Sequence, residues 1–118
     1  MSKHYDCSVY IMTNNNNRSL YTGLCNGLKH RVWKHKTNKY PGFTQKYKCY
    51  KLVYYENYQY IQDAIIREKQ IKNWRREKKV NLINIDNPGW NDLAQDWYDE
   101  KGLSEELKEN TITNESSS

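Results

Sequence analysis

The chain of 118 residues is poor in proline, glycine and phenylalanine, with two Pro, five Gly and one Phe. It also lacks any apolar run that approaches the length of a transmembrane helix, and its first residues carry no secretory signal pattern. From the last two absences we expect neither a membrane-spanning protein nor a secreted one. We therefore expect one cytoplasmic domain that does not enter the membrane.

Cysteine is scarce as well, with Cys7, Cys25 and Cys49 as its three representatives. Their number is odd and their spacing is not that of a metal site. In a reducing compartment, a buried cysteine behaves as a small apolar residue. We predict that all three are packed inside the protein.

Acidic residues are rare in the first two thirds of the chain. Residues 1–80 hold 17 Lys and Arg against 5 Asp and Glu, a net charge of +12, whereas residues 81–118 hold 2 against 9, a net charge of −7. A domain this basic attracts a polyanion, and nucleic acid is the first candidate, with a solvated basic face as the alternative. From about Lys101 the chain is acidic and then rich in Ser, Thr and Asn, which predicts a domain at 1–100 and a disordered tail at 101–118.

Several short patterns predict alternating strands and helices. Gly23 interrupts the second predicted strand and indicates the close approach of another backbone or of a ligand. Asn26 is a plausible cap for the first helix, and a last segment should pack back on the domain. The predicted elements are strands at 7–12, 20–24 and 50–56, helices at 26–35, 60–74 and 74–85, and a closing segment at 90–97.

One predicted helix contains a carboxylate in an unexpected place. Glu68 falls within an apolar stripe at helical spacing, where a carboxylate is costly unless a cation or donors meet it. Arg67, Lys69 and Lys72 lie around the helix from it, so we expect the partner to be a buried arginine, a tyrosine hydroxyl or a divalent metal. The alternative is a glutamate at the edge of the stripe that reaches water. The stripe comprises Tyr60, Ile61, Ala64, Ile65, Ile71 and Trp74.

Two further patterns suit contact with phosphates. Arg31 and His35 lie one helical turn apart, so the arginine could bind a phosphate while the histidine transfers a proton. The alternative is that the pair has no function, since such pairs also occur on ordinary helix surfaces. The loop at 36–48 interleaves lysines with aromatic residues, which is the composition of a nucleic-acid-contacting loop.

The ordered set of these features resembles the GIY-YIG nuclease superfamily, and more narrowly its small stand-alone bacterial endonucleases of the URI type. No single tripeptide is specific, but the order is, and the resemblance covers roughly residues 5–98. Ser8-Val9 and Thr22 depart from the two motifs and leave the motif tyrosines intact. The matching segments are Val9-Tyr10-Ile11, Tyr21-Thr22-Gly23, the Arg31 and His35 pair, the loop at 42–47, and Ala64-x-x-Arg67-Glu68-Lys69-Gln70-Ile71-Lys72.

The resemblance implies an α+β fold, a three-stranded antiparallel sheet with flanking helices. It also implies roles for individual residues. Tyr10 would act as general base and Tyr21 would orient water or phosphate, while Glu68 would bind Mg²⁺ or Mn²⁺. Asn81 and Asn84 match no catalytic asparagine and are not assigned. The full implied set is Tyr10, Tyr21, the motif glycine Gly23, the catalytic Arg31, His35 and Glu68.

By the same resemblance, the expected activity is metal-dependent hydrolysis of phosphodiester bonds in DNA, with RNA still open as a substrate and repair or recombination as the setting. Two alternatives remain at this point: a nucleic-acid-binding module that kept the fold without catalysis, and a nuclease domain that works only inside a complex. The residues expected to contact nucleic acid are Lys34, Lys46, Tyr47, Arg75 and Arg76.

Overall fold

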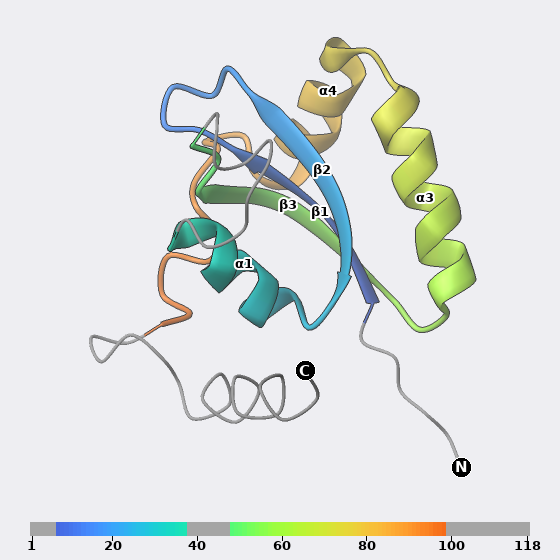
Figure 1. The fold of residues 1–118 in the computed structure, drawn as a ribbon. Helices are drawn as coiled ribbons and strands as arrows, with labels where there is room; N and C mark the ends of the chain where they lie inside the picture. Colours follow the sequence, from blue (N-terminus) through green and yellow to red (C-terminus); the bar gives the residue numbers. More distant parts are fainter. Residues whose placement is uncertain (1–6, 38–47, 99–118) are drawn as a thin grey trace.

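A computed structural model describes residues 7–37 and 48–98, which form a three-stranded antiparallel sheet with helices packed around it (Figure 1). The predicted α+β fold class is confirmed. The elements are β1 (Cys7–Thr13), β2 (Leu20–Asn26), α1 (Leu28–Lys36), β3 (Lys51–Tyr58), α3 (Ile61–Asn73) and α4 (Arg76–Asp86).

The central strand is β1, because the strand order is β2-β1-β3 and both neighbours pair with it in antiparallel register. Every residue of β1 is buried, which suits its run of apolar and β-branched side chains. Opposite β1, Tyr10 pairs with Gly23 of β2 and with Tyr55 of β3. The register therefore places the first motif tyrosine directly beside the motif glycine.

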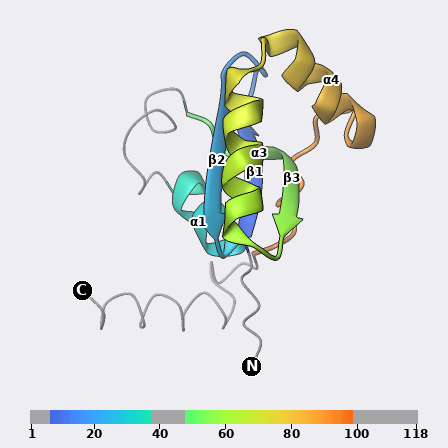
Figure 2. The same cartoon turned by 90° about the vertical axis from the view of Figure 1, so that its right-hand side faces the viewer.

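The two faces of the sheet carry separate clusters of apolar side chains, because successive strand residues point to opposite sides. One cluster joins Tyr10 and Met12 to Leu28 and Val32 of α1. The other joins residues such as Ile11 to α3 and α4, and its buried members are Cys7, Val9, Ile11, Val53, Tyr54, Ala64, Ile71 and Ile83. Figure 2 shows α1 and α3 on the two sides of the sheet, both alongside β2.

The start of α1 differs from the prediction. Asn26 does not cap the helix: it is the last residue of β2, and its side-chain oxygen lies 3.1 Å from Cys7 Sγ. Gly27 precedes the helix with a positive φ of 70°, a conformation that glycine adopts readily. The prediction was wrong because pairing with β1 extends the strand to Asn26.

The apolar stripe along α3 is shorter than predicted. Tyr60 and Ile61 are 59% and 41% exposed, whereas Ala64 and Ile71 are fully buried. Trp74 and Arg75 are extended and separate α3 from α4. The apolar face that holds α3 on the sheet is therefore narrow, and the two helices are distinct.

The closing segment packs back on the domain as predicted, through turns. The Leu93 backbone N–H donates to the Leu52 carbonyl at 2.8 Å, and the Tyr98 hydroxyl donates to the Lys29 carbonyl of α1 at 2.6 Å. Asp92 adds an ion pair with Lys36 at the end of α1. These contacts join α1, the start of β3 and the closing segment.

The three cysteines are buried, which confirms their prediction as packed residues. Within 7–37 and 48–98, no helix is long and apolar enough to cross a membrane. The predicted tail at 101–118 and the loop residues Lys46 and Tyr47 lie outside the described residues.

Candidate active site

Three aromatic side chains from three elements meet on the α1 side of the sheet. The Tyr10 hydroxyl lies 3.0 Å from His35 Nε2, and both side chains are buried. The ring centroids are 6.2 Å apart for Tyr10 and Tyr21, 5.7 Å for Tyr10 and His35, and 5.6 Å for Tyr21 and His35. The structure therefore brings these three predicted site residues together.

Gly23 makes room for this cluster. A Cβ atom at this position would lie 2.4 Å from Tyr10 Cζ and 2.5 Å from the Tyr10 hydroxyl oxygen, far inside van der Waals contact. In this structure the Tyr10 ring approaches Gly23, where the sequence suggested another backbone or a ligand. The glycine is needed because the ring lies across β2 at this point.

Burial decides the charge state of the two hydrogen-bonded groups. Desolvation, followed by the positive charge of Arg31, lowers the pKa of His35 to about 4. Desolvation, followed by the neighbouring Tyr21 and Cys25, raises the pKa of Tyr10, and Arg31 opposes this rise through its charge and hydrogen bonding. Tyr10 and His35 are therefore a neutral pair at physiological pH, and Arg31 alone does not make Tyr10 a phenolate.

Arg31 lies one turn before His35 on α1, on the side of the helix that buries Leu28 and His35. Its guanidinium is close enough to influence both members of the Tyr10–His35 pair. A guanidinium stays charged in any protein environment and presents donors that match phosphate oxygens. The cluster thus combines one permanent positive charge with two neutral proton carriers.

Glu68 has a different environment. Its Oε2 atom lies 2.7 Å from Lys72 Nζ, four residues further along α3. The prediction that Lys72 is a poor partner was wrong, because side chains four residues apart on a helix are neighbours. The Glu68 side chain is 14% exposed, so the carboxylate is nevertheless largely covered.

The position of Glu68 around α3 follows from its neighbour. Arg67 pairs with Glu56 of β3 at 2.9 Å. The buried line through Ala64 and Ile71 runs between Arg67 and Glu68, which are about 100° apart around the helix. Since Arg67 lies on the flank toward β3, Glu68 lies on the flank toward β2.

The height of Glu68 along the sheet can be estimated in the same way. β3 ends at Tyr58, opposite Cys7, and α3 returns from that end of the sheet. From Ile61 to Glu68 the helix rises about 10 Å, which corresponds to about three strand residues from Cys7. Glu68 is therefore about level with Tyr10 and Gly23.

The structure does not place all predicted site residues on one face. Tyr10, Tyr21, Arg31 and His35 gather on the α1 side, whereas α3 covers the opposite side. Strand β2 is the edge between them, and both helices lie beside it (Figure 2). These predicted site residues therefore form two groups, one on either side of strand β2 at the edge of the sheet.

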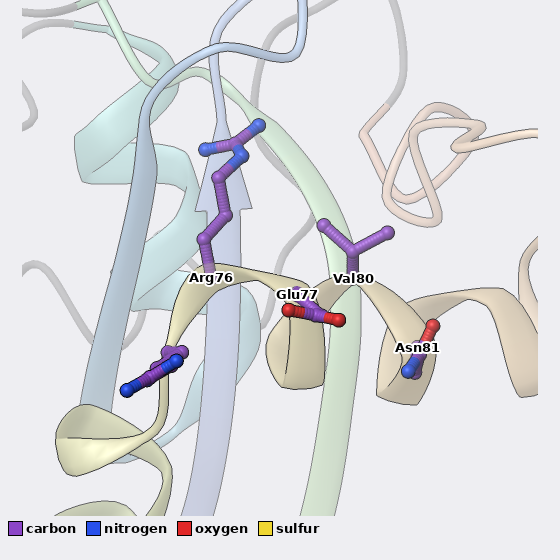
Figure 3. Close-up of a pocket in the computed structure, with 5 residues that line it drawn as sticks. Arg76, Glu77, Val80 and Asn81 are labelled. Carbon is purple, nitrogen blue, oxygen red and sulfur yellow. The ribbon is translucent and has the colours of Figure 1, made fainter.

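Of the described residues predicted to contact nucleic acid, Lys34 lies partly buried on α1, and Arg75 and Arg76 lie exposed at the start of α4. Arg76 has a structural role that the sequence did not indicate. Its guanidinium donates to the carbonyls of Asn17 and Arg18, both at 2.6 Å, and so ties α4 to the β1–β2 loop. A surface pocket of about 500 Å³ lies beside it, lined by Arg75, Arg76, Glu77, Val80 and Asn81. Figure 3 shows the side chains that line this pocket.

The donor set near the site limits which metal fits. Among the residues that the structure describes, no three His, Cys, Asp or Glu side chains gather into a metal site. Glu68 supplies a single carboxylate, which fits Mg²⁺ because this ion keeps several waters and takes one or two carboxylates together with substrate phosphates. The same set does not fit structural zinc, which needs four protein ligands.

Comparisons with known proteins identify the family of the chain. A family model described as the GIY-YIG catalytic domain matches residues 6–81. A UPF0213 protein of Staphylococcus epidermidis is 37% identical over 83 residues, covering 70% of this chain and 96% of that protein. A UPF0213 protein of Staphylococcus saprophyticus is 34% identical over 84 residues, covering 71% and 98%.

A solution NMR structure of a UPF0213 protein from Bacillus halodurans is also similar, with a TM-score of 0.49 and 25% identity over 77% of this chain and 97% of that one. The family match spans most of the chain, and the sequence matches cover nearly the whole of the staphylococcal proteins. The chain therefore belongs to the GIY-YIG nuclease superfamily, among relatives of the UPF0213 proteins.

Proposed function

We propose that this protein is an endonuclease that hydrolyses phosphodiester bonds in DNA with the help of a divalent metal ion. The observation that carries the proposal is the hydrogen bond between two buried neutral groups, Tyr10 and His35, beside the Arg31 charge. A module that only binds nucleic acid needs no such pair in its core. The nuclease family to which the chain belongs adds independent support.

The Tyr10–His35 pair supports a proton relay. With His35 neutral and unprotonated at Nε2, the Tyr10 hydroxyl donates to it. When a water molecule attacks phosphorus, its proton passes to the Tyr10 oxygen while the Tyr10 proton passes to Nε2. His35 ends as an imidazolium, which the extra negative charge of the phosphorane stabilises. Tyr10 can thus act as a base without first becoming a phenolate.

Arg31 and Tyr21 complete the α1 side of the site. The Arg31 guanidinium would bind the non-bridging oxygens of the scissile phosphate, where preorganised charge contributes most to such reactions. Tyr21, at centroid distances near 6 Å from both relay residues, would orient the attacking water. Attack from this side and departure of the 3′ oxygen would leave a 5′ phosphate and a 3′ hydroxyl.

Glu68 is the residue that would hold the metal, Mg²⁺ or Mn²⁺. The bound ion supplies Lewis-acid stabilisation of the negative charge that develops on phosphate and leaving group. Since Glu68 and Arg31 flank β2 from opposite sides, the scissile phosphate would lie over the β2 edge. The DNA strand would cross this edge about level with Gly23.

A cleavage screen tests this function. The purified protein is incubated with flap, branched, nicked and single-stranded DNA, and with RNA, in Mg²⁺ or in chelator, and the product ends are identified. We expect Mg²⁺-dependent cleavage of DNA with 5′-phosphate ends, and preference for flaps or branches would place the enzyme in repair or recombination. Tight binding of every substrate without cleavage would instead support the binding module.

A further inference from the structure

Helix α1 carries His35 but is weakly held by its own sequence. It has nine residues, its cap residue Gly27 has no side chain, and its first turn holds no acidic residue. A short helix without such signals depends on tertiary contacts, and its last turn frays easily. His35 lies in that last turn, one residue before the helix ends. The hydrogen bond between Tyr10 and His35 therefore needs an anchor at this end of α1.

Lys36, the last residue of α1, provides such an anchor. Its Nζ atom donates to the backbone carbonyl of Tyr50 at 3.0 Å and forms an ion pair with Asp92 Oδ2. The two charged side chains are mostly covered, with 23% of Lys36 and 19% of Asp92 exposed. A pair in this position is screened less than a surface pair. It holds the end of α1 against the segment that leads into β3.

The second oxygen of Asp92 binds backbone donors. Oδ1 accepts from the N–H of Leu52 at 3.1 Å and from the N–H of Ala94 at 3.0 Å. Leu52 and Ala94 are fully buried, and both belong to the same apolar cluster as Tyr10. The two oxygens of Asp92 thus have separate partners, because one binds β3 and the closing segment while the other binds α1.

These bonds connect the two elements that carry the relay. Tyr10 belongs to β1 and His35 to α1. Leu52 of β3 pairs with β1 two residues beyond Tyr10. Asp92 links Leu52 to Lys36, which follows His35 in the chain. Through this path of hydrogen bonds, the position of the histidine is set relative to the strand that carries the tyrosine.

We propose that Asp92 is a positioning residue of the nuclease, which fixes the end of α1 so that His35 Nε2 stays within hydrogen-bond distance of the Tyr10 hydroxyl. Asp92 acts through Lys36 and not on the substrate. The inference rests on the proposed function in one respect, the use of the Tyr10–His35 pair as a proton relay. Asp92 lies beyond residues 6–81, which match the GIY-YIG model, so the closing segment would take part in the site from outside that match.

Asp92→Asn separates the two roles of this carboxylate. The amide keeps an oxygen for the N–H groups of Leu52 and Ala94, but it presents an NH₂ group to Lys36, which has only donors. Lys36→Met breaks the same link from the other side. The matched control is Glu56→Gln, which removes a carboxylate that is paired with a cation on the opposite side of the sheet. A melting curve for each variant verifies that the proteins are folded.

The first measurement is the NMR signal of the His35 ring nitrogens in the protein without DNA. In the wild type, Nε2 accepts from Tyr10 in the proposed relay, so the ring proton should lie on Nδ1. We expect Asp92→Asn and Lys36→Met to shift the ring toward a mixture of the two tautomers. Glu56→Gln should leave the signal as in the wild type, because a general loss of stability does not change this hydrogen bond.

The second measurement is single-turnover cleavage of a branched DNA. Asp92→Asn should lower the rate at saturating DNA about tenfold to hundredfold and leave the half-saturating DNA concentration near that of the wild type, since misalignment affects proton transfer more than binding. The double variant Asp92→Asn, Lys36→Met should be no slower than the slower single variant, because both changes break one link.

The outcomes separate the two proposals. A wild-type nitrogen signal in Asp92→Asn would overturn the positioning role, and so would a shifted signal with an unchanged cleavage rate. An equal loss of rate in Glu56→Gln would also overturn it, since the loss would then follow general stability. If the wild type cleaves no DNA while the nitrogen signal shifts in Asp92→Asn, the link to His35 stands and the proposed nuclease function fails.

Discussion

A glutamate paired with a cation lies on each flank of α3, Glu56 of β3 on one side and Glu68 of the helix itself on the other, and the two carboxylates differ in their hydrogen bonds. On the β3 side, Arg67 donates from Nε and Nη2 to both oxygens of Glu56, at 3.0 and 2.9 Å. Tyr58 donates to the same carboxylate at 2.6 Å, and Tyr54 donates as well. On the β2 side, the one described partner of Glu68 is Lys72.

The difference shows which carboxylate can take a ligand. Burial alone would raise the pKa of Glu56, but hydrogen bonds from Arg67, Tyr54 and Tyr58 lower it below its ordinary value. These donors occupy the acceptor positions of Glu56, so its role is to fix α3 on the sheet. The Glu68 carboxylate is largely covered, but its oxygens can accept further ligands besides Lys72. This environment suits the binding of a metal ion.

The largest effect should come from Glu68→Gln, which keeps the volume and removes the charge. We expect cleavage to fall about a thousandfold or more, because the metal contribution to transition-state stabilisation is lost. DNA affinity measured in chelator and the melting temperature should stay close to those of the wild type. A strong loss of stability would make Glu68 a structural residue like Glu56, and the contrast between the flanks would disappear.

The next largest effect should come from Tyr10→Phe, on the other side of the β2 edge. Loss of the hydroxyl that contacts His35 removes the proposed relay, and we expect the single-turnover rate to fall about a hundredfold to ten-thousandfold. Tyr54→Phe is a matched control, since it removes a buried hydroxyl on the Glu56 side. Equal rates for the two variants would contradict the relay.

Glu56→Gln should show the reverse behaviour of Glu68→Gln. The change leaves Arg67 without its carboxylate in a partly buried position, and we expect the free energy of unfolding to fall by about 2 kcal/mol. Denaturant titration measures this loss. At a temperature where the variant is folded, its cleavage rate and its dependence on Mg²⁺ should match the wild type; a changed Mg²⁺ dependence would refute the assignment of Glu56 to structure alone.

A further effect on stability concerns pH and the α1 side. The pKa of His35 is about 4 in the folded protein and about 6.5 in an unfolded chain, so the unfolded state binds the proton more readily. Stability should be complete above about pH 6.5 and fall toward pH 4, with a slope of up to about 1.4 kcal/mol per pH unit. His35→Tyr should flatten this slope in denaturant titrations at several pH values, and an unchanged slope would assign it to other groups.

Much of the fold could be predicted because it depends on local pattern. Short sequence patterns predicted the three strands. The spacing of Arg31 and His35 predicted that both lie on one side of a helix. Gly23 was recognised as a close approach, although its neighbour, the Tyr10 ring, depends on the register between β1 and β2. Tyr10, Tyr21 and His35 come from three different elements, and their association could be expected from the family resemblance.

The rest depends on contacts between distant residues. Arg76 binds carbonyls 58 and 59 residues away, which no spacing rule predicts. The pairing of Glu68 with Lys72 was missed for another reason. The prediction from the sequence considered the apolar stripe of the helix and overlooked that Lys72, four residues after Glu68, lies next to it on the helix surface.

The most direct test of the metal-dependent nuclease is the single-turnover cleavage rate of one branched DNA as a function of Mg²⁺ concentration, for the wild type and for Glu68→Gln. We predict that the wild-type rate is zero in chelator, rises with Mg²⁺ and saturates, whereas the variant stays near the baseline throughout. Two coinciding curves, or wild-type cleavage that persists in chelator, would contradict the account.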